Sequence, residues 1–315
     1  MRVLLTSNSR YPASLGGNGS SRVHDAIAKG LAEMGHKVMY WVQDGIGGRL
    51  PRGVTAVDRC TVDADIYHFN KVPSEDEAPP GGKPWLRTYH AACDWTSFRK
   101  AAMTDNVVFV SRAHAESFGW TRYVWNGVDP SELTYSETKD DYFVFLVSHL
   151  WRGREKGLGI AIAIAEHFGA RLIVGAALDD FMPDSLRSPN VEYRGMIDGV
   201  EKAELLAGAR ALLFPTQITE PFGLVIAEAL FSGTPVITST KGACPELVTS
   251  DVGFTCDTIE DYLAAVTALP TIRPADCRRR AMAEFDYRVM ARRYVAEYEY
   301  ELDRRGKSNF LKTTG

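Results

Sequence analysis

Short runs of β-branched and aromatic residues alternate along the chain with stretches of helical periodicity. Val3–Asn8 and Val38–Val42 have the composition of buried strands, and apolar residues recur at helical spacing over 23–34 between them. Gly35 is placed to end that helix. A strand, a helix and a second strand in this order form a βαβ unit, in which the two strands are parallel. The alternation therefore predicts an α/β fold whose parallel sheets are covered by helices.

The same alternation continues through the rest of the chain. Helices are expected over Leu158–Phe168 and Arg278–Glu301. Further strands are expected at Ile66–Phe69, Trp85–Tyr89, Val107–Val110, Tyr123–Trp125, Tyr142–Val147, Arg171–Gly175, Val191–Tyr193, Ala211–Phe214 and Pro235–Thr238. The polar segment 131–141 lacks apolar periodicity, and we interpret it as a linker. Because one hydrophobic core rarely exceeds about 250–300 residues, the 315-residue chain is expected to form two domains, 1–135 and 136–285.

Composition and charge exclude several classes of protein. The formal net charge of −4 gives no electrostatic reason to expect a nucleic-acid partner. No apolar stretch approaches the roughly 20 residues that span a bilayer, and the N-terminal segment becomes polar too early for a signal peptide. The five cysteines are spread out without a CxxC pattern, which argues against a disulfide framework or a zinc site. These features favour a cytoplasmic protein.

A glycine-rich loop that contains Gly16 and Gly17 lies between the first strand and the first helix. In a doubly wound sheet this position is at the carboxyl end of a strand, where ligands bind. Glycines there allow backbone N–H groups to approach a phosphate, beside a helix N-terminus that favours negative charge. The loop lacks the GxGxxG fingerprint of dinucleotide-binding proteins, and a plain flexible turn fits the pattern equally well.

A second candidate segment follows the predicted strand Ala211–Phe214. Pro221 is expected in the first turn of a helix, where Phe222 and Gly223 would offer free N–H groups to a phosphate or a sugar hydroxyl. Glu228 follows Glu220 by eight residues, on nearly the same face of such a helix. A carboxylate there can accept two hydroxyl protons from a ribose diol. Taken alone, the two glutamates would be interpreted as a helix N-terminal charge and an exposed polar position, because such spacing is common by chance.

A third candidate is the cationic loop 148–157, which precedes the first helix of the second half. Its Arg152, Arg154 and Lys156 could neutralise a diphosphate leaving group without a metal ion. As an isolated motif, the loop would be interpreted as a solvated connection between a strand and a helix.

Taken in their order along the chain, these motifs resemble the retaining glycosyltransferases of family 4. The segments that carry the resemblance are Gly35–Val38, Asn126–Asp129, Lys156-Gly157, Phe214–Thr216, Glu220–Glu228, Gly233–Val236 and Pro245–Val248. The resemblance implies the GT-B fold, in which two facing Rossmann-like domains enclose a cleft that holds the donor. It also implies that a C-terminal helix, about 286–315, crosses back to complete the N-terminal domain. The residues expected to pack this helix are Tyr287, Tyr294, Tyr298 and Tyr300.

The resemblance also implies catalytic roles. Glu220 would contact hydroxyls of the donor sugar, Lys156 would stabilise the departing diphosphate, and His90 would face the donor sugar. Without the resemblance, His90 would be interpreted as a structural residue at the end of a strand. The implied donor-binding residues are Gly16, Gly17, Arg152, Arg154, Phe222, Gly223, Leu224 and Glu228, with Glu228 on the ribose.

One position departs from the family pattern. Relatives carry Gly-Arg-Leu where this chain has Ser148-His149-Leu150, so the usual diphosphate-binding arginine is missing from its aligned place at His149. We hypothesise that Arg152 or Arg154 takes over its role.

The implied function is transfer of a sugar from a nucleotide diphosphate sugar to an acceptor hydroxyl, with retention of the anomeric configuration. UDP is the expected nucleotide only because it is the frequent donor nucleotide in the family. Neither a metal ion nor another cofactor is expected. Asp63-Ala64-Asp65 has the form of a metal-binding motif, but it precedes the strand Ile66–Phe69, away from the ligand edge. A catalytically silent nucleotide-sugar-binding protein and a GT-B nucleotide-sugar epimerase, which needs no acceptor, stay open as alternatives.

The expected partners are a nucleotide sugar and a hydroxyl-bearing acceptor of unknown identity. Arginine runs in the C-terminal helices, Arg278-Arg279-Arg280, Arg292-Arg293 and Arg304-Arg305, resemble patches that bind anionic lipid in membrane-associated relatives. A solvated helix face paired with nearby glutamates is the simpler interpretation.

Overall fold

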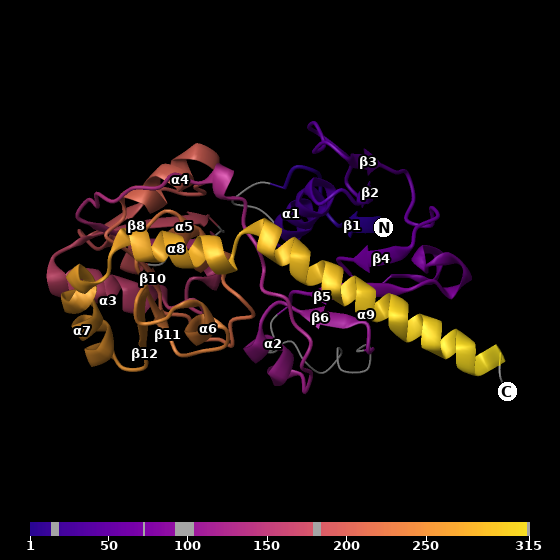
Figure 1. Cartoon of the computed structure of the whole chain (residues 1–315). Helices are drawn as coiled ribbons and strands as arrows, with labels where there is room; N and C mark the ends of the chain where they lie inside the picture. Colours follow the sequence, from indigo (N-terminus) through magenta and orange to yellow (C-terminus); the bar gives the residue numbers. More distant parts are fainter. Residues whose placement is uncertain (14–18, 72, 92–103, 179–183, 314–315) are drawn as a thin grey trace. The chain divides into compact units, whose positions relative to one another are not determined.

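The computed structural model describes residues 1–13, 19–71, 73–91, 104–178 and 184–313 of the chain, which divides into two compact units (Figure 1). Of the described residues, the first unit contains 1–13, 19–127 and 287–313, and the second contains Val128–Asp286. The segment expected as a linker, 131–141, lies inside the second unit. The chain instead passes between the units at Gly127–Val128 and again at Asp286–Tyr287.

The first unit is built on a six-stranded parallel sheet with the order β3-β2-β1-β4-β5-β6. Its strands are β1 (Arg2–Ser7), β2 (Lys37–Val42), β3 (Val54–Ala56), β4 (Ile66–Phe69), β5 (Trp85–Tyr89) and β6 (Val107–Phe109). Its helices are α1 (Gly19–Glu33), α2 (Arg112–Ser117) and α9 (Tyr287–Thr313). The direction of winding reverses between β1 and β4, so a topological switch point lies between these neighbouring strands.

The second unit repeats this arrangement with the strand order β12-β11-β10-β7-β8-β9, again all parallel. Its strands are β7 (Tyr142–His149), β8 (Arg171–Ala177), β9 (Val191–Tyr193), β10 (Ala211–Phe214), β11 (Val236–Ser239) and β12 (Gly253–Cys256). Its helices are α3 (Leu158–Phe168), α4 (Gly199–Gly208), α5 (Leu224–Phe231), α6 (Cys244–Leu247), α7 (Ile259–Ala268) and α8 (Pro274–Glu284). The switch point of this sheet lies between β7 and β10.

The core of each unit follows from the apolar runs that predicted the strands. Leu4, Tyr67 and Phe69 are buried in the first unit, and Phe143 and Leu213 are buried in the second. Strands with both faces covered by helices need such continuous apolar runs. The predicted parallel α/β architecture is therefore confirmed in both units.

Two predicted elements are wrong. Residues 123–125 form no strand, because only Tyr123 pairs with Phe109, through an isolated bridge. The single helix expected over Arg278–Glu301 is two helices, α8 and α9, separated at Phe285–Asp286. Phe285 is fully buried and its carbonyl accepts a hydrogen bond from the Val128 N–H, so tertiary pairing interrupts a segment whose local pattern is helical throughout.

Helix α9, the long yellow helix of Figure 1, packs against α1 and β5 of the first unit. Tyr287, Tyr294 and Tyr298 are fully buried, as expected, whereas Tyr300 is 52% exposed and was wrongly placed in this interface. The helices approach closely at Gly30, where an added Cβ would lie 2.6 Å from the Ala291 Cβ. The Tyr287 hydroxyl donates a hydrogen bond to Glu33 at 2.7 Å, which joins the C-terminal helix to the end of α1.

All three arginines of the run 278–280 form hydrogen bonds or ion pairs within the second unit. Arg278 donates a hydrogen bond to the Phe231 carbonyl at 2.6 Å, and Arg280 donates to the Leu247 carbonyl at 2.8 Å. Arg279 forms an ion pair with Asp276. The partners of this run are therefore backbone carbonyls and an aspartate, in place of the glutamates that the simpler interpretation named. None of the helices in the described ranges combines the length and the apolar character that a bilayer crossing requires.

Replacement of Gly30 by Val is expected to destabilise the first unit. The added side chain must displace Ala291 or Tyr287, and overpacking of this kind typically lowers the free energy of unfolding by about 1–3 kcal/mol. The matched control is Gly159→Val in the first turn of α3, where nothing lies within 4 Å of the added Cβ. Urea unfolding of both variants measures the difference, and equal losses would contradict the close approach of α1 and α9.

Candidate active site

Lys156 and Glu220 meet at the switch point of the second sheet. Lys156 lies in the loop after β7, and Glu220 lies in the loop after β10, the strand beside β7. Their side chains form an ion pair, and the two residues are only 8% and 7% exposed. The structure thus brings together two predicted catalytic residues that are 64 positions apart in the sequence.

Two glycines allow the backbone segments around this ion pair to approach neighbouring backbone closely. Gly157 has a φ of 81°, and a Cβ at this position would overlap the Pro215 carbonyl. Gly242 has a φ of 60°, and a Cβ there would overlap the backbone of Glu220. The Ala243 N–H donates a hydrogen bond to the Glu220 carbonyl at 2.9 Å. Both charged residues are therefore held by close backbone contacts that only glycine permits.

Helix α5 begins later than the sequence indicates. Pro221 lies before the helix rather than in its first turn, and the first helical residue is Leu224. Gly223 occupies the N-cap position in the left-handed conformation, with a φ of 90°, so the chain turns there before the helix starts. Phe222 is 2% exposed and packs edge-to-face on Phe285, with ring centroids 5.9 Å apart. The Phe222 side chain therefore anchors the loop, and the N–H groups of the first helical turn begin at Leu224.

Glu228 lies inside α5 and is fully buried, which overturns its interpretation as an exposed polar position. Its carboxylate lies 2.6 Å from the Lys202 Nζ of α4, and Lys202 is itself only 7% exposed. Because Glu220 precedes the helix, the two glutamates do not share a helix face. Sequence reasoning missed Lys202, since a lysine in an amphipathic helix is ordinarily solvated and only the packing of α4 on α5 buries it.

Arg152 and Arg154 differ in their surroundings. The Arg152 Nε lies 3.7 Å from a Glu155 carboxylate oxygen, and its guanidinium lies 5.7 Å from the Trp151 ring centroid. Arg154 is exposed and lines a groove of about 660 Å³ at the start of α3, together with Gly157, Gly159 and Gln217. Within the described ranges, the Arg154 guanidinium makes no hydrogen bond or ion pair. Arg154 is thus the arginine that is available to a ligand.

In the first unit, His90 follows β5 at the carboxyl edge of the sheet. Its ring centroid lies 5.8 Å from that of His24 in α1, which lies 4.7 Å from that of His68 in β4. Burial lowers the pKa of His90 well below its usual value, so the ring is neutral at neutral pH. The predicted donor-binding residues Gly16 and Gly17 lie outside the described residues.

His114 of α2 supports the segment that follows His90. Its Nε2 donates a hydrogen bond to the Ala91 carbonyl at 2.9 Å, and its ring stacks on Tyr89 with centroids 5.7 Å apart. Burial lowers the pKa of His114 to about 4. The position of His90 therefore depends on a neighbouring imidazole that is neutral in the folded protein.

The carboxylates of Asp63 and Asp65 are used in structural ion pairs. Both pair with Arg2, and Asp63 also pairs with Lys83. They lie before β4, at the amino end of the first sheet, as the sequence indicates.

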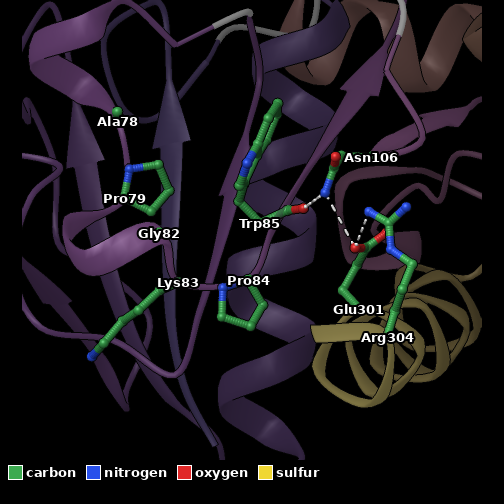
Figure 2. Close-up of a pocket in the computed structure, with 9 residues that line it drawn as sticks. All are labelled: Ala78, Pro79, Gly82, Lys83, Pro84, Trp85, Asn106, Glu301 and Arg304. Atoms are coloured by element: carbon green, nitrogen blue, oxygen red, sulfur yellow. Dashed lines mark hydrogen bonds and ion pairs between the residues drawn. The ribbon is translucent and has the colours of Figure 1, made fainter. Parts of the chain in front are cut away.

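A pocket of about 400 Å³ also lies at this amino edge of the first unit (Figure 2). Asn106, which precedes β6, donates hydrogen bonds to the Trp85 carbonyl at 2.6 Å and to Glu301 at 3.2 Å. Arg304 donates to the same Glu301 carboxylate at 2.8 Å. Asn106, Glu301 and Arg304 thus pair with one another, at the sheet edge opposite to that which binds ligands in such folds.

Comparisons with solved structures define the class of fold. AviGT4, described as a glycosyltransferase involved in Avilamycin A biosynthesis, superposes with a TM-score of 0.78 at 24% identity, covering 96% of this chain and 98% of its own. Alr3699/HepE from Anabaena, solved in complex with UDP-glucose, superposes with a TM-score of 0.68 at 16% identity, covering 95% and 100%. The chain therefore has the predicted GT-B fold.

Sequence comparisons assign the second unit more closely. Residues 142–271 match the family model of glycosyl transferases group 1, and this region contains Lys156, Glu220 and Glu228. Glycogen synthase from Mycobacterium tuberculosis is 31% identical over 158 residues, which span 44% of this chain and 38% of that protein. The matched residues thus span well under half the length of this curated relative.

The Lys156–Glu220 pair is expected to couple strongly in a double-mutant cycle. Glu220→Gln leaves a buried cation and Lys156→Met leaves a buried carboxylate, so each single variant should lose about 3 kcal/mol of unfolding free energy. The double variant should lose less than the sum by about 1–3 kcal/mol. The exposed pair Arg171–Glu192 is the control, for which a coupling below about 1 kcal/mol is expected. Equal coupling in the two cycles, measured by urea unfolding without nucleotide, would contradict the burial of the pair.

His114 should make the stability of the first unit sensitive to acid. The unfolded chain binds a proton near the ordinary histidine pKa of about 6.5, whereas the folded protein binds it only near pH 4. Between these values the unfolded state holds more protons, so wild type should lose up to about 1.4 kcal/mol per pH unit relative to His114→Leu as the pH falls. Urea unfolding of both proteins from pH 7 to pH 4 measures this difference, and a difference independent of pH contradicts it.

Proposed function

We propose that this protein is a glycosyltransferase that transfers a sugar from a UDP-sugar to an acceptor hydroxyl, with retention of the anomeric configuration and without a catalytic metal. The observation that carries the proposal is the buried Lys156–Glu220 ion pair at the switch point of the second sheet. This pair lies in the region that matches glycosyl transferases group 1. The structural similarity to Alr3699/HepE, which was solved with UDP-glucose, supports UDP as the nucleotide.

In this proposal each residue acts on a different part of the donor. Glu220 accepts hydrogen bonds from hydroxyls of the sugar, and Lys156 contributes positive charge beside the diphosphate. Glu228 holds the ribose diol, with its carboxylate oriented by Lys202. Backbone N–H groups at the start of α5, around Leu224, face the diphosphate. Gly16 and Gly17 would complete the phosphate contacts.

The reaction breaks the bond between the anomeric carbon and the diphosphate oxygen, and forms a bond from the acceptor oxygen on the same face of the sugar. The acceptor proton passes to the departing phosphate oxygen, so the leaving group acts as the base that deprotonates the acceptor hydroxyl. Negative charge that develops on UDP is stabilised by Lys156 and by a second cation, which we assign to Arg154. His90 is neutral, so it can offer one hydrogen-bond donor and one acceptor to the sugar.

Metal independence follows from the same assignment. Lysine and arginine supply the positive charge that a divalent ion supplies in other sugar transferases. The carboxylates of the Asp63-Ala64-Asp65 motif are paired with Arg2 and Lys83 and are not part of this site. Activity is therefore expected to persist in EDTA.

Arg154 and Arg152 form a matched pair of variants for testing the proposal. Arg154→Ala is expected to weaken UDP binding at least about ten-fold, because one charge-assisted contact typically contributes about 1.5–3 kcal/mol. Arg152→Ala should bind UDP like wild type, since Arg152 contacts Glu155 and Trp151 instead. Calorimetric titration with UDP measures affinity, and release of UDP from UDP-glucose with and without acceptors measures turnover. UDP binding without turnover for any acceptor would favour the silent binding protein, and acceptor-independent conversion of the donor sugar would favour the epimerase.

A further inference from the structure

The segment 131–141, which the sequence predicted as a linker, contacts the ends of two helices of the second unit. α4 leads into β10 and α5 leads into β11, so both helices end at the amino edge of the parallel sheet. The two helices pack against each other (Figure 1). Lys139 precedes β7, the strand beside β10, and therefore lies at the same edge. The topology of the sheet thus brings Lys139 to both helix ends.

Lys139 donates hydrogen bonds to both of these helix ends. Its Nζ donates to the Ala207 carbonyl of α4 at 2.7 Å, and to the Ser232 carbonyl at the C-cap of α5 at 3.1 Å. A third bond, of 2.9 Å, goes to the Thr234 hydroxyl, which itself donates to the Leu206 carbonyl of α4. Burial lowers the pKa of Lys139 to about 8, so the group is still an ammonium at pH 7. An ammonium has three donors, and all three are used in joining α4 to α5.

The charge of Lys139 suits this position. The last carbonyls of a helix have no partner within the helix, and they carry the negative end of its dipole. Neighbouring residues complete the end of α4. The Tyr142 hydroxyl donates to the Leu205 carbonyl at 2.8 Å. The Asp140 N–H donates to the Gly208 carbonyl at 2.7 Å. These two donors are neutral groups bonded to α4, whereas Lys139 is a cation shared by the negative ends of two helices.

A second contact joins the same two helices about one turn closer to their N-termini. Lys202 of α4 and Glu228 of α5 form the buried ion pair described above. Lys202 precedes Leu206 by four residues, and Glu228 precedes Ser232 by four residues, so each lies about one turn from a helix end that Lys139 or Thr234 bonds. The eight-residue α5 is only about 12 Å long. A shift of its end relative to α4 therefore displaces Glu228 relative to Lys202.

We propose that Lys139 is a positioning residue for the donor: its ammonium fixes α4 against α5 and thereby holds Glu228 where it can accept both ribose hydroxyls. The inference rests on the proposed function, because it assigns a residue that acts through Glu228 on the ribose. Two hydrogen bonds to one carboxylate require close control of distance and angle, so they respond to small displacements of α5. Lys139 itself touches no substrate, since it lies at the amino edge of the sheet and ligands bind at the carboxyl edge.

The test compares two nucleotides that differ only in the ribose diol. Calorimetric titration at pH 7 measures the affinity of the full chain for UDP and for 2′,3′-dideoxyuridine 5′-diphosphate, which lacks both ribose hydroxyls. Lys139→Met should weaken UDP binding about five-fold, because residues linked in one network typically influence one another at this level. Its affinity for the dideoxy nucleotide should equal that of wild type. Equal losses for the two nucleotides, or no loss for UDP, overturn the proposal.

Arg278 supplies the matched control variant. Its guanidinium donates to the Phe231 carbonyl at 2.6 Å, so it also places a cation at the end of α5, but it does so from α8. Both Lys139→Met and Arg278→Met should lower the melting temperature, because each leaves a helix-end carbonyl without its cationic partner. Only Lys139→Met should reduce the preference for UDP over the dideoxy nucleotide. An equal reduction in Arg278→Met contradicts a specific link between α4 and α5 through Lys139.

A double variant shows whether Lys139 acts through Glu228. Glu228→Gln removes the carboxylate that is proposed to hold the diol, so its UDP affinity should be lower than that of wild type. Because Lys139 has no other route to the ribose in this proposal, adding Lys139→Met to Glu228→Gln should cause no further loss of UDP affinity. Losses that add in the double variant would mean that Lys139 affects the nucleotide by another route, which overturns the proposal.

Urea unfolding without nucleotide separates this inference from the proposed function. Lys139→Met and Lys202→Met should be coupled, so that the folding equilibrium constant of the double variant differs at least about two-fold from the value expected for independent effects. Arg278→Met with Lys202→Met should show no such coupling. Coupling without UDP binding supports the positioning of Glu228 by Lys139 and contradicts the donor assignment. UDP binding with neither coupling nor a changed nucleotide preference overturns the role of Lys139 and leaves the donor assignment intact.

Discussion

The buried ion pair between Lys156 and Glu220 is the constraint around which the second unit is organised. Two opposite charges are stable at this depth only when they lie in contact, so the loops after β7 and β10 must be placed with little freedom. Gly157 and Gly242 provide the backbone approach that this placement requires. The parallel pairing of β7 with β10 also contributes to this placement, because it brings both loops to one edge of the sheet.

The switch point of the second sheet gathers charged residues from several elements. It contains the ion pairs Lys156–Glu220 and Lys202–Glu228, together with the exposed Arg154. Under the proposed function these charges match the donor, which carries a diphosphate and a ribose diol.

Much of the fold could be predicted because its strands are buried on both faces. Ile66–Phe69, Trp85–Tyr89 and Ala211–Phe214 are apolar or aromatic runs whose observed bounds agree with prediction. Errors arose where a tertiary contact overrides a local pattern. Phe285 interrupts a helical sequence because its backbone pairs with Val128, and the left-handed Gly223 delays the start of α5 beyond Pro221. Periodicity reports only the local preference of the chain, so it could predict neither the break at Phe285 nor the late start of α5.

The sequence by itself determined the alternation of strands and helices, the two-unit organisation and the positions of the motif residues, because these depend on local composition and spacing. Only the tertiary structure decided how the side chains are paired. Lys202 reaches Glu228 through the packing of α4 on α5, and Arg154 is distinguished from Arg152 by the position of Glu155. Contacts between residues far apart in the sequence depend on strand order and register, which local patterns do not encode.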